Sequence, residues 1–342
     1  SFGIAGFPNG DASKAGNRWP REYVARAFLR QTIDLDGERV FVPTETNQLS
    51  GSYSSRRLVI TAGKLAVGDV FGDNRYSRDA RTQFMNWSLL EAGAWDFASD
   101  ARQYTWGGAV ELILGDYALR YGSFTMPTRY NPPETTWHGF GSLHHVVELA
   151  REHVIAGLPG AVRLLGFYSR AHGARFREVL ASPLPAEEAM PALRRFGTPK
   201  IGFVLNTEQA LTPQLGAFLR ASWDDGRSED ISFTQIDRSL SAGLSLAGTS
   251  WQRPNDTLGL AGAVNAISHG HRSVLRAGGT GLIVGSMQSY SEEYIGEIYY
   301  NAALPMRGVS LAANFQIIGH PGYDSARGPV FVFGGRLHFA ID

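Results

Sequence analysis

The chain has 342 residues, and its 32 lysines and arginines balance its 32 aspartates and glutamates, which excludes the basic surface typical of a nucleic-acid-binding protein. It contains no cysteine, as is common in chains that cross an oxidising compartment. No run of about 18 apolar residues occurs, so we expect no transmembrane helix. The first residues also lack the basic and apolar regions of a signal peptide, and we therefore expect a mature, trimmed or partial sequence.

The first predicted strand follows a glycine-rich segment, residues 1–20, that shows no period and is expected to form a loop. From residue 23 to residue 35, apolar residues alternate with charged ones, which is the period of a β-strand with two different faces. Arg26 and Arg30 fall on the same polar face, about 13 Å apart. A turn follows, and residues 57–64 are the next predicted strand.

The segment from residue 69 to residue 100 is different, because it has no period of two and is dense in Arg, Asp, Asn and Trp. A loop of this length is usually functional or disordered, and its aromatic content argues against disorder. We expect it to fold inward between the strands and to narrow the space that they enclose. Asp69, Asp73 and Arg81 are expected to pin the loop in place. The side chains that it would present to a solute are Arg75, Arg81, Trp87, Trp95 and Asp96.

Alternation with a period of two returns after residue 104 and continues to the end of the chain. The further strands that it predicts are residues 105–114, 117–122, 143–154, 161–172, 201–208, 215–223, 239–246, 257–267, 293–301, 309–317 and 331–341. Long loops are expected at residues 127–141, 174–198 and 268–285. Residues 174–198 are rich in helix formers, but three prolines interrupt them, so we expect at most one helical turn there.

The final stretch shows the pattern most clearly, because Phe331, Phe333, Leu337 and Phe339 lie on one face and Arg336 lies on the other. About thirteen such strands follow one another in hairpin order, with short turns and long loops in alternation. Several strands are about ten residues long, which is enough to cross a bilayer at a tilt, whereas a soluble β-sandwich has strands of about five or six residues. The sequence therefore predicts an all-β fold, a transmembrane antiparallel up-and-down β-barrel with long external loops, in a single domain over residues 1–342.

The charged residues on the alternate positions are expected to face the inside of this barrel. They are Arg26, Arg30, Glu111, Arg120, Glu208, Arg220, Asp224, Glu297 and Arg336. Arginines and carboxylates form hydrogen bonds with sugar hydroxyls, and aromatic rings stack on the sugar face. Opposed rows of the two charges also order water and bias the passage of ions. Each of these residues taken alone could instead be a solvated wall charge or a salt bridge. Trp106, Tyr117 and Tyr121 fall on the outward face, where we expect them to lie at the membrane interface.

Two other classes of function were weighed against a pore for small solutes. His144, His145 and Glu148 suggest a metal site or a catalytic site, but adjacent residues on a strand point to opposite faces, so both histidines cannot bind one metal ion. No serine lies in a recognisable catalytic arrangement, and we expect no enzymatic activity, no metal and no cofactor. A barrel that exports an acidic polysaccharide should have a strongly basic interior, whereas both signs are mixed here. Export and non-selective diffusion remain the alternatives.

Several blocks of the sequence resemble the OprB-type carbohydrate-selective porins of Gram-negative outer membranes. The blocks are residues 3–10, 27–32, 61–64, 69–76, 81–87, 93–96, 240–245, 253–261, 323–330 and 335–338. Together they extend over nearly the whole chain. Two departures are a family region before Gly3 that has no counterpart here, and a chain end at Ile341 and Asp342 where such barrels commonly end on an aromatic residue.

This resemblance implies a barrel of sixteen strands when complete, located in the outer membrane, that passes sugars by diffusion. Because an open barrel would leave unpaired backbone in lipid, we expect the N-terminal strands of the barrel to be missing from this chain. The implied partners are small sugars, outer-membrane lipid and lipopolysaccharide, with no nucleic acid. The protein would assemble as a homotrimer or remain a monomer.

Overall fold

The computed structural model describes residues 3–10, 19, 22–44, 47–135, 137 and 141–340. Most of the loop expected at residues 1–20, part of the loop at 127–141, and the final Ile341 and Asp342 lie outside the described residues. The described strands are β1 (Ala27–Asp34), β2 (Arg39–Val42), β3 (Gly51–Ser54), β4 (Arg56–Leu65), β5 (Thr105–Leu114), β6 (Tyr117–Thr125), β7 (Leu143–Ile155), β8 (Leu158–Gly173), β9 (Arg195–Ala210), β10 (Leu215–Asp224), β11 (Arg238–Ala247), β12 (Thr257–Ala266), β13 (Glu293–Ala303), β14 (Val309–Gly319) and β15 (Val330–Phe339).

Thirteen of these strands form one antiparallel sheet in the order β1-β4-β5 and onward to β15, so that, apart from β2 and β3, each strand pairs with the next one along the chain. All thirteen predicted strands are confirmed. The additional strands β2 and β3 pair with each other in a separate ribbon, and the sequence did not predict them because four residues are too few to show a period. β9 begins at Arg195, earlier than expected, and β1 begins at Ala27, later than expected.

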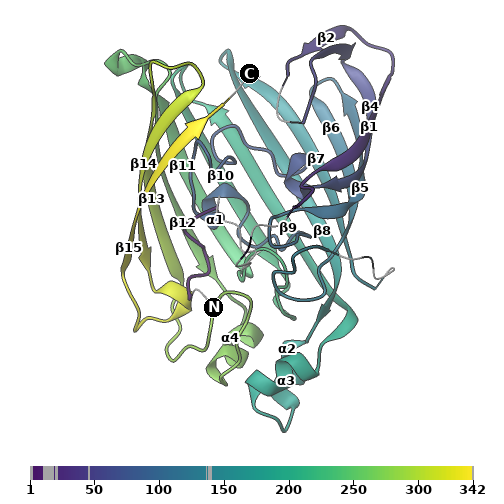
Figure 1. Cartoon of the computed structure of the whole chain (residues 1–342), viewed down its shortest axis with the longest axis vertical. Coiled ribbons are helices and arrows are strands. Elements are labelled where there is room, and N and C mark those ends of the chain that lie inside the picture. The colour runs from purple at the N-terminus through teal and green to yellow at the C-terminus, as the bar shows by residue number, and fades with distance from the viewer. Residues whose placement is uncertain are drawn as a thin grey trace.

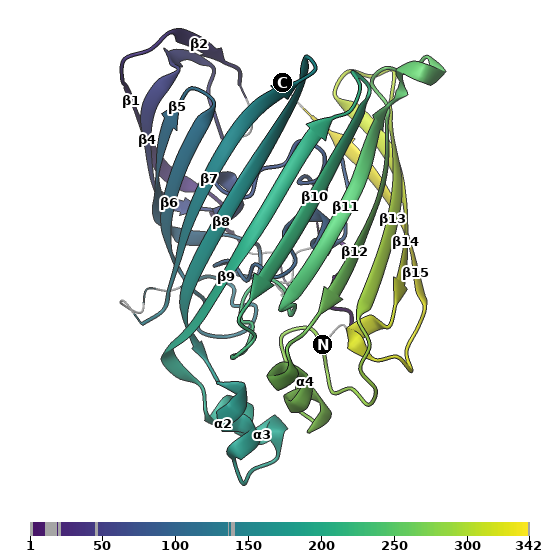
Figure 2. The ribbon, with the colours of Figure 1, turned by 180° about the vertical axis from the view of Figure 1, so that it is seen from behind.

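The sheet curves around a hollow, and β1 and β15 are its two edges (Figures 1 and 2). Within the described residues β1 pairs only with β4, and β15 only with β14. The sheet is therefore not closed, and the closed barrel of sixteen strands remains a prediction.

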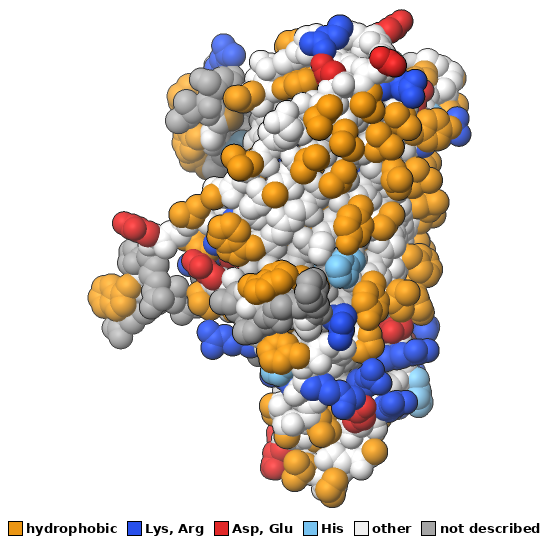
Figure 3. Space-filling view, turned by 90° about the vertical axis from the view of Figure 1, so that its right-hand side faces the viewer, with side chains coloured by type: hydrophobic (Ala, Val, Ile, Leu, Met, Phe, Trp, Pro, Cys, Tyr) orange, Lys and Arg blue, Asp and Glu red, His pale blue; other side chains and the backbone are white. Residues whose placement is uncertain are grey.

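The two faces of the sheet differ as the alternation predicts. On β8, Leu164 and Tyr168 point outward and are 54% and 42% exposed, whereas Leu165 and Ser169 point inward and are 4% and 1% exposed. Figure 3 shows hydrophobic side chains spread over much of the outer surface. Trp106 also lies exposed on this face, as its position in the alternation predicts.

At one end of the sheet the strands are joined by short turns, except for β1 and β4, which are joined there through β2 and β3; long connections with helices join the strands at the other end (Figure 2). The expectation of a loop with at most one helical turn at residues 174–198 is wrong, because α2 (Phe176–Ala181) and α3 (Ala186–Ala192) lie there. Residues 268–285 likewise contain α4 (His269–Arg276).

The prolines were a poor guide to residues 174–198 because two of them lie outside the helices and Pro191 lies near the end of α3. Buried Phe176, Met190 and Val274 join the three helices in one apolar cluster, which stabilises them. No helix of the described residues is long and apolar enough to cross a membrane.

The outward face should tolerate a charge at its rim but not at its middle. Replacing Leu164 by Arg should lower the free energy of unfolding from lipid by about 2–4 kcal/mol, because the guanidinium would lie near the centre of the bilayer. Ile155, which is also exposed on the outward face but lies at the short-turn end of β7, offers the matched control, for which we expect about 0–1 kcal/mol. Urea unfolding in lipid vesicles measures both, and equal losses would show that this face does not lie against lipid.

Candidate functional site

The connection between β4 and β5, residues 66–104, folds onto the concave face of the sheet and fills part of the hollow. It contains one turn of 3₁₀ helix, η1 (Val67–Asp69), and one turn of α-helix, α1 (Trp87–Leu90). We call this segment the inner loop. The expected inward fold of residues 69–100 is confirmed.

Carboxylates of the wall hold the backbone of the inner loop. The Glu297 carboxylate on β13 accepts hydrogen bonds from the backbone N–H groups of Met85 and Asn86, at 2.7 and 2.9 Å. Glu208 on β9 accepts one from the backbone of Arg75 at 2.6 Å. Buried N–H groups outside regular structure need such acceptors, so these two glutamates anchor the loop.

Arginines of the wall hold the carbonyl groups of the same loop. The buried Arg220 on β10 donates from Nη1 to the carbonyl of Leu89 at 2.5 Å and from Nη2 to the carbonyl of Ser77. Arg336 on β15 donates to the carbonyl of Gln83 at 2.7 Å. The inward direction predicted for these arginines is therefore correct, and their hydrogen bonds go to the protein backbone.

The inner loop in turn holds a second connection, between β10 and β11. The buried Asp96 carboxylate accepts hydrogen bonds from the backbone N–H groups of Ile231, Ser232 and Phe233, at 2.8 to 2.9 Å. One carboxylate thus fixes three successive residues of another loop.

The two tryptophans predicted to meet a solute are packed inside the protein. Trp87 is fully buried and stacks on Phe233, with 5.0 Å between the ring centroids. Trp95 is also buried, and its Nε1–H donates to Nε2 of His144 at 3.2 Å. His145 points to the opposite face and stacks on Tyr121, so the two histidines lie on opposite faces as expected.

A large open cavity remains between the inner loop and strands β1, β4, β5 and β6, with a volume of about 1160 Å³. We call it the channel cavity. Its charged lining comprises Arg26, Arg30, Arg57, Asp69, Asp73, Arg78, Asp79, Arg81, Glu91, Glu111 and Arg120.

Charges of opposite sign are paired along the wall of the channel cavity. Arg26 makes a two-pronged contact with Asp69, from Nε at 2.9 Å and Nη2 at 2.8 Å. Arg120 bridges Glu111 at 2.9 Å and the buried Glu148 at 2.7 Å. The prediction that Glu111 and Arg120 share the inner face is confirmed. Both pairs fix the guanidinium planes, which leaves rigid groups at the cavity wall.

Arg30 combines polar and apolar contacts at the same wall. It donates to Thr61 Oγ1 and to the carbonyl of Asn47, each at 3.1 Å. Its guanidinium carbon lies 5.3 Å from the ring centroid of Phe28, which also lines the cavity. A ring face and a hydrogen-bond donor therefore lie side by side on β1.

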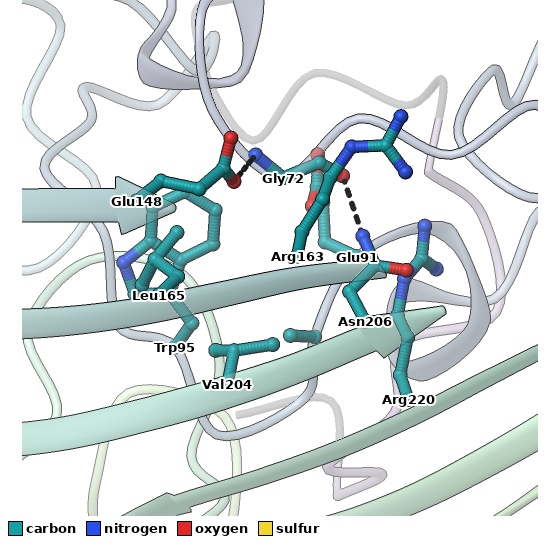
Figure 4. Close-up of a pocket in the computed structure, with 10 residues that line it drawn as sticks. Gly72, Glu91, Trp95, Glu148, Arg163, Leu165, Val204, Asn206 and Arg220 are labelled. Carbon is teal, nitrogen blue, oxygen red and sulfur yellow. Dashed lines mark hydrogen bonds between the residues drawn. The ribbon is translucent and has the colours of Figure 1, made fainter. Parts of the chain in front are cut away.

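Glu91 lines the channel cavity and also a small adjoining cavity of about 10 Å³, which is close to the size of one water molecule. Figure 4 shows Glu91 there beside Arg163 and Arg220. Burial raises the pKa of the Glu91 carboxyl to about 7, and the charges of Arg78 and Arg220 partly offset this effect. The group therefore changes its charge near neutral pH.

The structure brings together five of the predicted site residues at the channel cavity. These are Arg26, Arg30, Arg81, Glu111 and Arg120. The others, outside its lining, are Arg75, Trp87, Trp95, Asp96, Glu208, Arg220, Asp224, Glu297 and Arg336, and whether any of the fourteen meets a solute remains a prediction. Asp69, Asp73 and Arg81, expected to pin the loop, form ion pairs with Arg26, Arg78 and Asp79 and also line the cavity.

Sequence reasoning missed Arg57, Arg78, Asp79 and Glu91 among the cavity residues. Arg57 could have been found, because it has the same strand parity as the inward-facing Val59. The other three lie in the inner loop, which has no period from which a direction can be read.

One buried cluster has the atoms of a metal site. Ligand atoms of Asp230, Asp237 and His271 lie within 4.8 Å of one another. The Lys200 ammonium binds Asp230, however, and so already places a cation there. The oxygen of Gln235 accepts two backbone N–H groups, so its amide N–H donates to His271 Nε2, and the ring donates from Nδ1 to Asp237. Because His271 Nδ1 carries a proton, it cannot act as a ligand, and the cluster is a salt-bridge network.

Asp224 belongs to this network. Its carboxylate lies 3.5 Å from Lys200 Nζ and accepts a hydrogen bond from the backbone of Gly226 at 2.7 Å.

The family of the chain follows from a comparison with known proteins. The model of the OprB family of carbohydrate-selective porins matches residues 5–341. The chain belongs to the OprB family. It is accordingly a Gram-negative outer-membrane porin of a carbohydrate-selective family, a passive channel and not an enzyme. No match was found among curated proteins.

One solved structure shows the same fold, and others are more distantly similar. The high-pH structure of Pseudomonas putida OprB is 19% identical, with a TM-score of 0.64, and the match covers 82% of this chain and 69% of that one. The low-pH structure of that protein gives 15% identity, coverages of 82% and 62%, and a TM-score of 0.46. Pseudomonas aeruginosa OccK11 (OpdR) gives 10% identity, coverages of 84% and 65%, and a TM-score of 0.42.

Replacing Asp96 by Ala should loosen the inner loop, because three buried N–H groups lose their acceptor. An unsatisfied buried N–H costs about 1–3 kcal/mol, so we expect a loss of at least about 3 kcal/mol in the free energy of unfolding, together with noisier single-channel currents. Asp96→Asn keeps one acceptor oxygen, so its free energy of unfolding should lie between those of the wild type and Asp96→Ala. The control is Asp116→Ala in the exposed β5–β6 turn. Quiet, wild-type currents in Asp96→Ala would show that the loop is held by other contacts.

Ion selectivity should change with pH through Glu91. Above pH 7 the carboxyl is ionised and adds a negative charge to the cavity lining, so the preference for cations should rise between pH 5 and pH 9. A unit charge about 10 Å from an ion in water stabilises a cation by roughly 0.4 kcal/mol and destabilises an anion by as much, which gives about a fourfold change in the cation-to-anion permeability ratio. Reversal potentials across a planar bilayer in a salt gradient measure this ratio. The curve of this ratio against pH should show an inflection near pH 7 in the wild type and in the control Glu152→Gln, but not in Glu91→Gln. An inflection that persists in Glu91→Gln would show that another group titrates there.

Proposed function

We propose that this chain admits small neutral sugars, of the size of glucose and short oligosaccharides, by passive diffusion through the channel cavity. The supporting observation is the fixed mixture of charges at its wall, where Arg26 and Asp69, and Arg120 and Glu111, are held in pairs. Such pairs offer donors and acceptors to hydroxyl groups with no net charge to attract or repel a solute.

The apolar side of the sugar contact is provided by Phe28, Tyr53 and Phe97, which line the cavity. They take the role that the sequence assigned to Trp87 and Trp95. A sugar ring lying on Phe28 would have the Arg30 guanidinium beside it, so that one side of the ring packs while its hydroxyls accept hydrogen bonds.

The lining argues against export of an acidic polymer. Of its charged residues six are arginines and five are aspartates or glutamates, whereas a channel for a polyanion should be strongly basic. Non-selective diffusion is the remaining alternative, and the experiment below separates it from sugar selectivity.

Liposome swelling with the full-length protein tests the proposal. Glucose should enter faster than a zwitterionic amino acid of similar size, because an amino acid must lose more hydration to pass between fixed charges. Equal rates for the two solutes would identify a general diffusion pore.

Arg30→Ala should lower the glucose-to-amino-acid ratio by roughly fivefold, which corresponds to a hydrogen bond of about 1 kcal/mol. The matched control is Arg151→Ala, which removes an exposed arginine from the outer face of β7, and its ratio should be unchanged. An unchanged ratio in Arg30→Ala would remove Arg30 from the sugar path.

A further inference from the structure

A row of rings crosses the outer face of the sheet toward its long-loop end. Tyr121 on β6 stacks on His145 on β7, with 6.3 Å between the centroids, and His145 stacks on Tyr168 on β8 at 6.5 Å. Aromatic rings gather where a membrane meets water, because they have an apolar body and a polar edge. The row therefore marks the membrane boundary on this side of the protein.

Exposed arginines lie just beyond this row. Arg170 is two residues past Tyr168 on the same face of β8, which places it about 7 Å nearer the loops. Its guanidinium lies against Gly197 at the start of β9, and Arg195 is paired in register with Gly173 at the end of β8.

The loop between β6 and β7 brings a third arginine to the same place. His172 Nδ1 lies 2.9 Å from the carbonyl of Thr128, and exposed Arg129 follows it directly. We call Arg129, Arg170 and Arg195 the basic band. Figure 3 shows Lys and Arg side chains gathered low on the outer surface, below its largest hydrophobic area.

The charge of the basic band is largely uncompensated. Arg195 pairs with Glu178 at 2.5 Å, whereas Arg129 and Arg170 have no carboxylate partner in the described part of the chain.

We propose that the basic band binds the phosphate groups of a phosphorylated glycolipid in the outer leaflet of the membrane. In outer-membrane barrels the long loops lie on the external side, so the band faces that leaflet at the height of its headgroups. Guanidinium groups bind phosphate through paired hydrogen bonds. Leu164 and Ile201, both exposed on β8 and β9 on the bilayer side of the band, would lie against the acyl chains of the same lipid. The proposal does not depend on which solute the channel passes.

The test compares bis-phosphorylated lipid A with its dephosphorylated form, each titrated into the full-length protein in detergent, with binding followed by native mass spectrometry. The phosphorylated lipid should bind and the dephosphorylated one should bind much more weakly. Each arginine near a charged membrane surface contributes about 1 kcal/mol, or roughly fivefold in affinity, so Arg129→Gln with Arg170→Gln should weaken binding by about 25-fold.

The matched control is Arg56→Gln with Arg151→Gln, which removes two exposed arginines at the other end of the wall and should leave binding unchanged. Both variants should retain wild-type glucose swelling, which shows that they are folded. Equal binding of the two lipids, or equal weakening in the control variant, would overturn the proposal. Inorganic phosphate that displaces the lipid at equal concentration would also overturn it, because the band would then be a free-phosphate site.

Discussion

The structure depends on satisfying the backbone of a segment that has almost no regular structure. Residues 66–104 lie inside the curved sheet, where each buried N–H and C=O group without a partner would cost free energy. The wall supplies the partners. Glu208 and Glu297 accept from N–H groups of the segment, and Arg220 and Arg336 donate to its carbonyls. Ionised side chains suit this task, because their hydrogen bonds are stronger than those between neutral groups.

Inward charges of the same type therefore perform different tasks in different parts of the sheet. On β9 to β15, four of them bind the backbone of the inner loop: Glu208, Arg220, Glu297 and Arg336. At the channel cavity, Arg120 on β6 pairs with Glu111 on β5, and Arg26, just before β1, pairs with Asp69 at the start of the inner loop. Under the proposed function, only charged residues of the second region contribute to solute choice, because they line the channel cavity.

The sequence predicted the thirteen strands and the direction of their side chains. Each strand lies between an apolar and a polar environment, so apolar and polar residues alternate along it. The inner loop has no period, and its partners are far away in the chain: Met85 and Glu297 are 212 residues apart. Nothing in the sequence could therefore show that Trp87 packs on Phe233 instead of facing a solute. Helix α3 was missed for a related reason, since its stability comes from packing against α2 and α4 and not from its own proline-containing sequence.

The anchors of the inner loop bind mostly its main chain, and this has a consequence for how such channels diversify. Glu297, Glu208 and Arg220 contact groups that every residue carries. Side chains of the loop that face the cavity, such as Arg78, Asp79 and Arg81, can then be exchanged without disturbing the attachment of the loop. Under the proposed function, the residues that attach the loop differ from those that face the solute, so a few substitutions in the cavity would change the preferred solute while the wall folds unchanged.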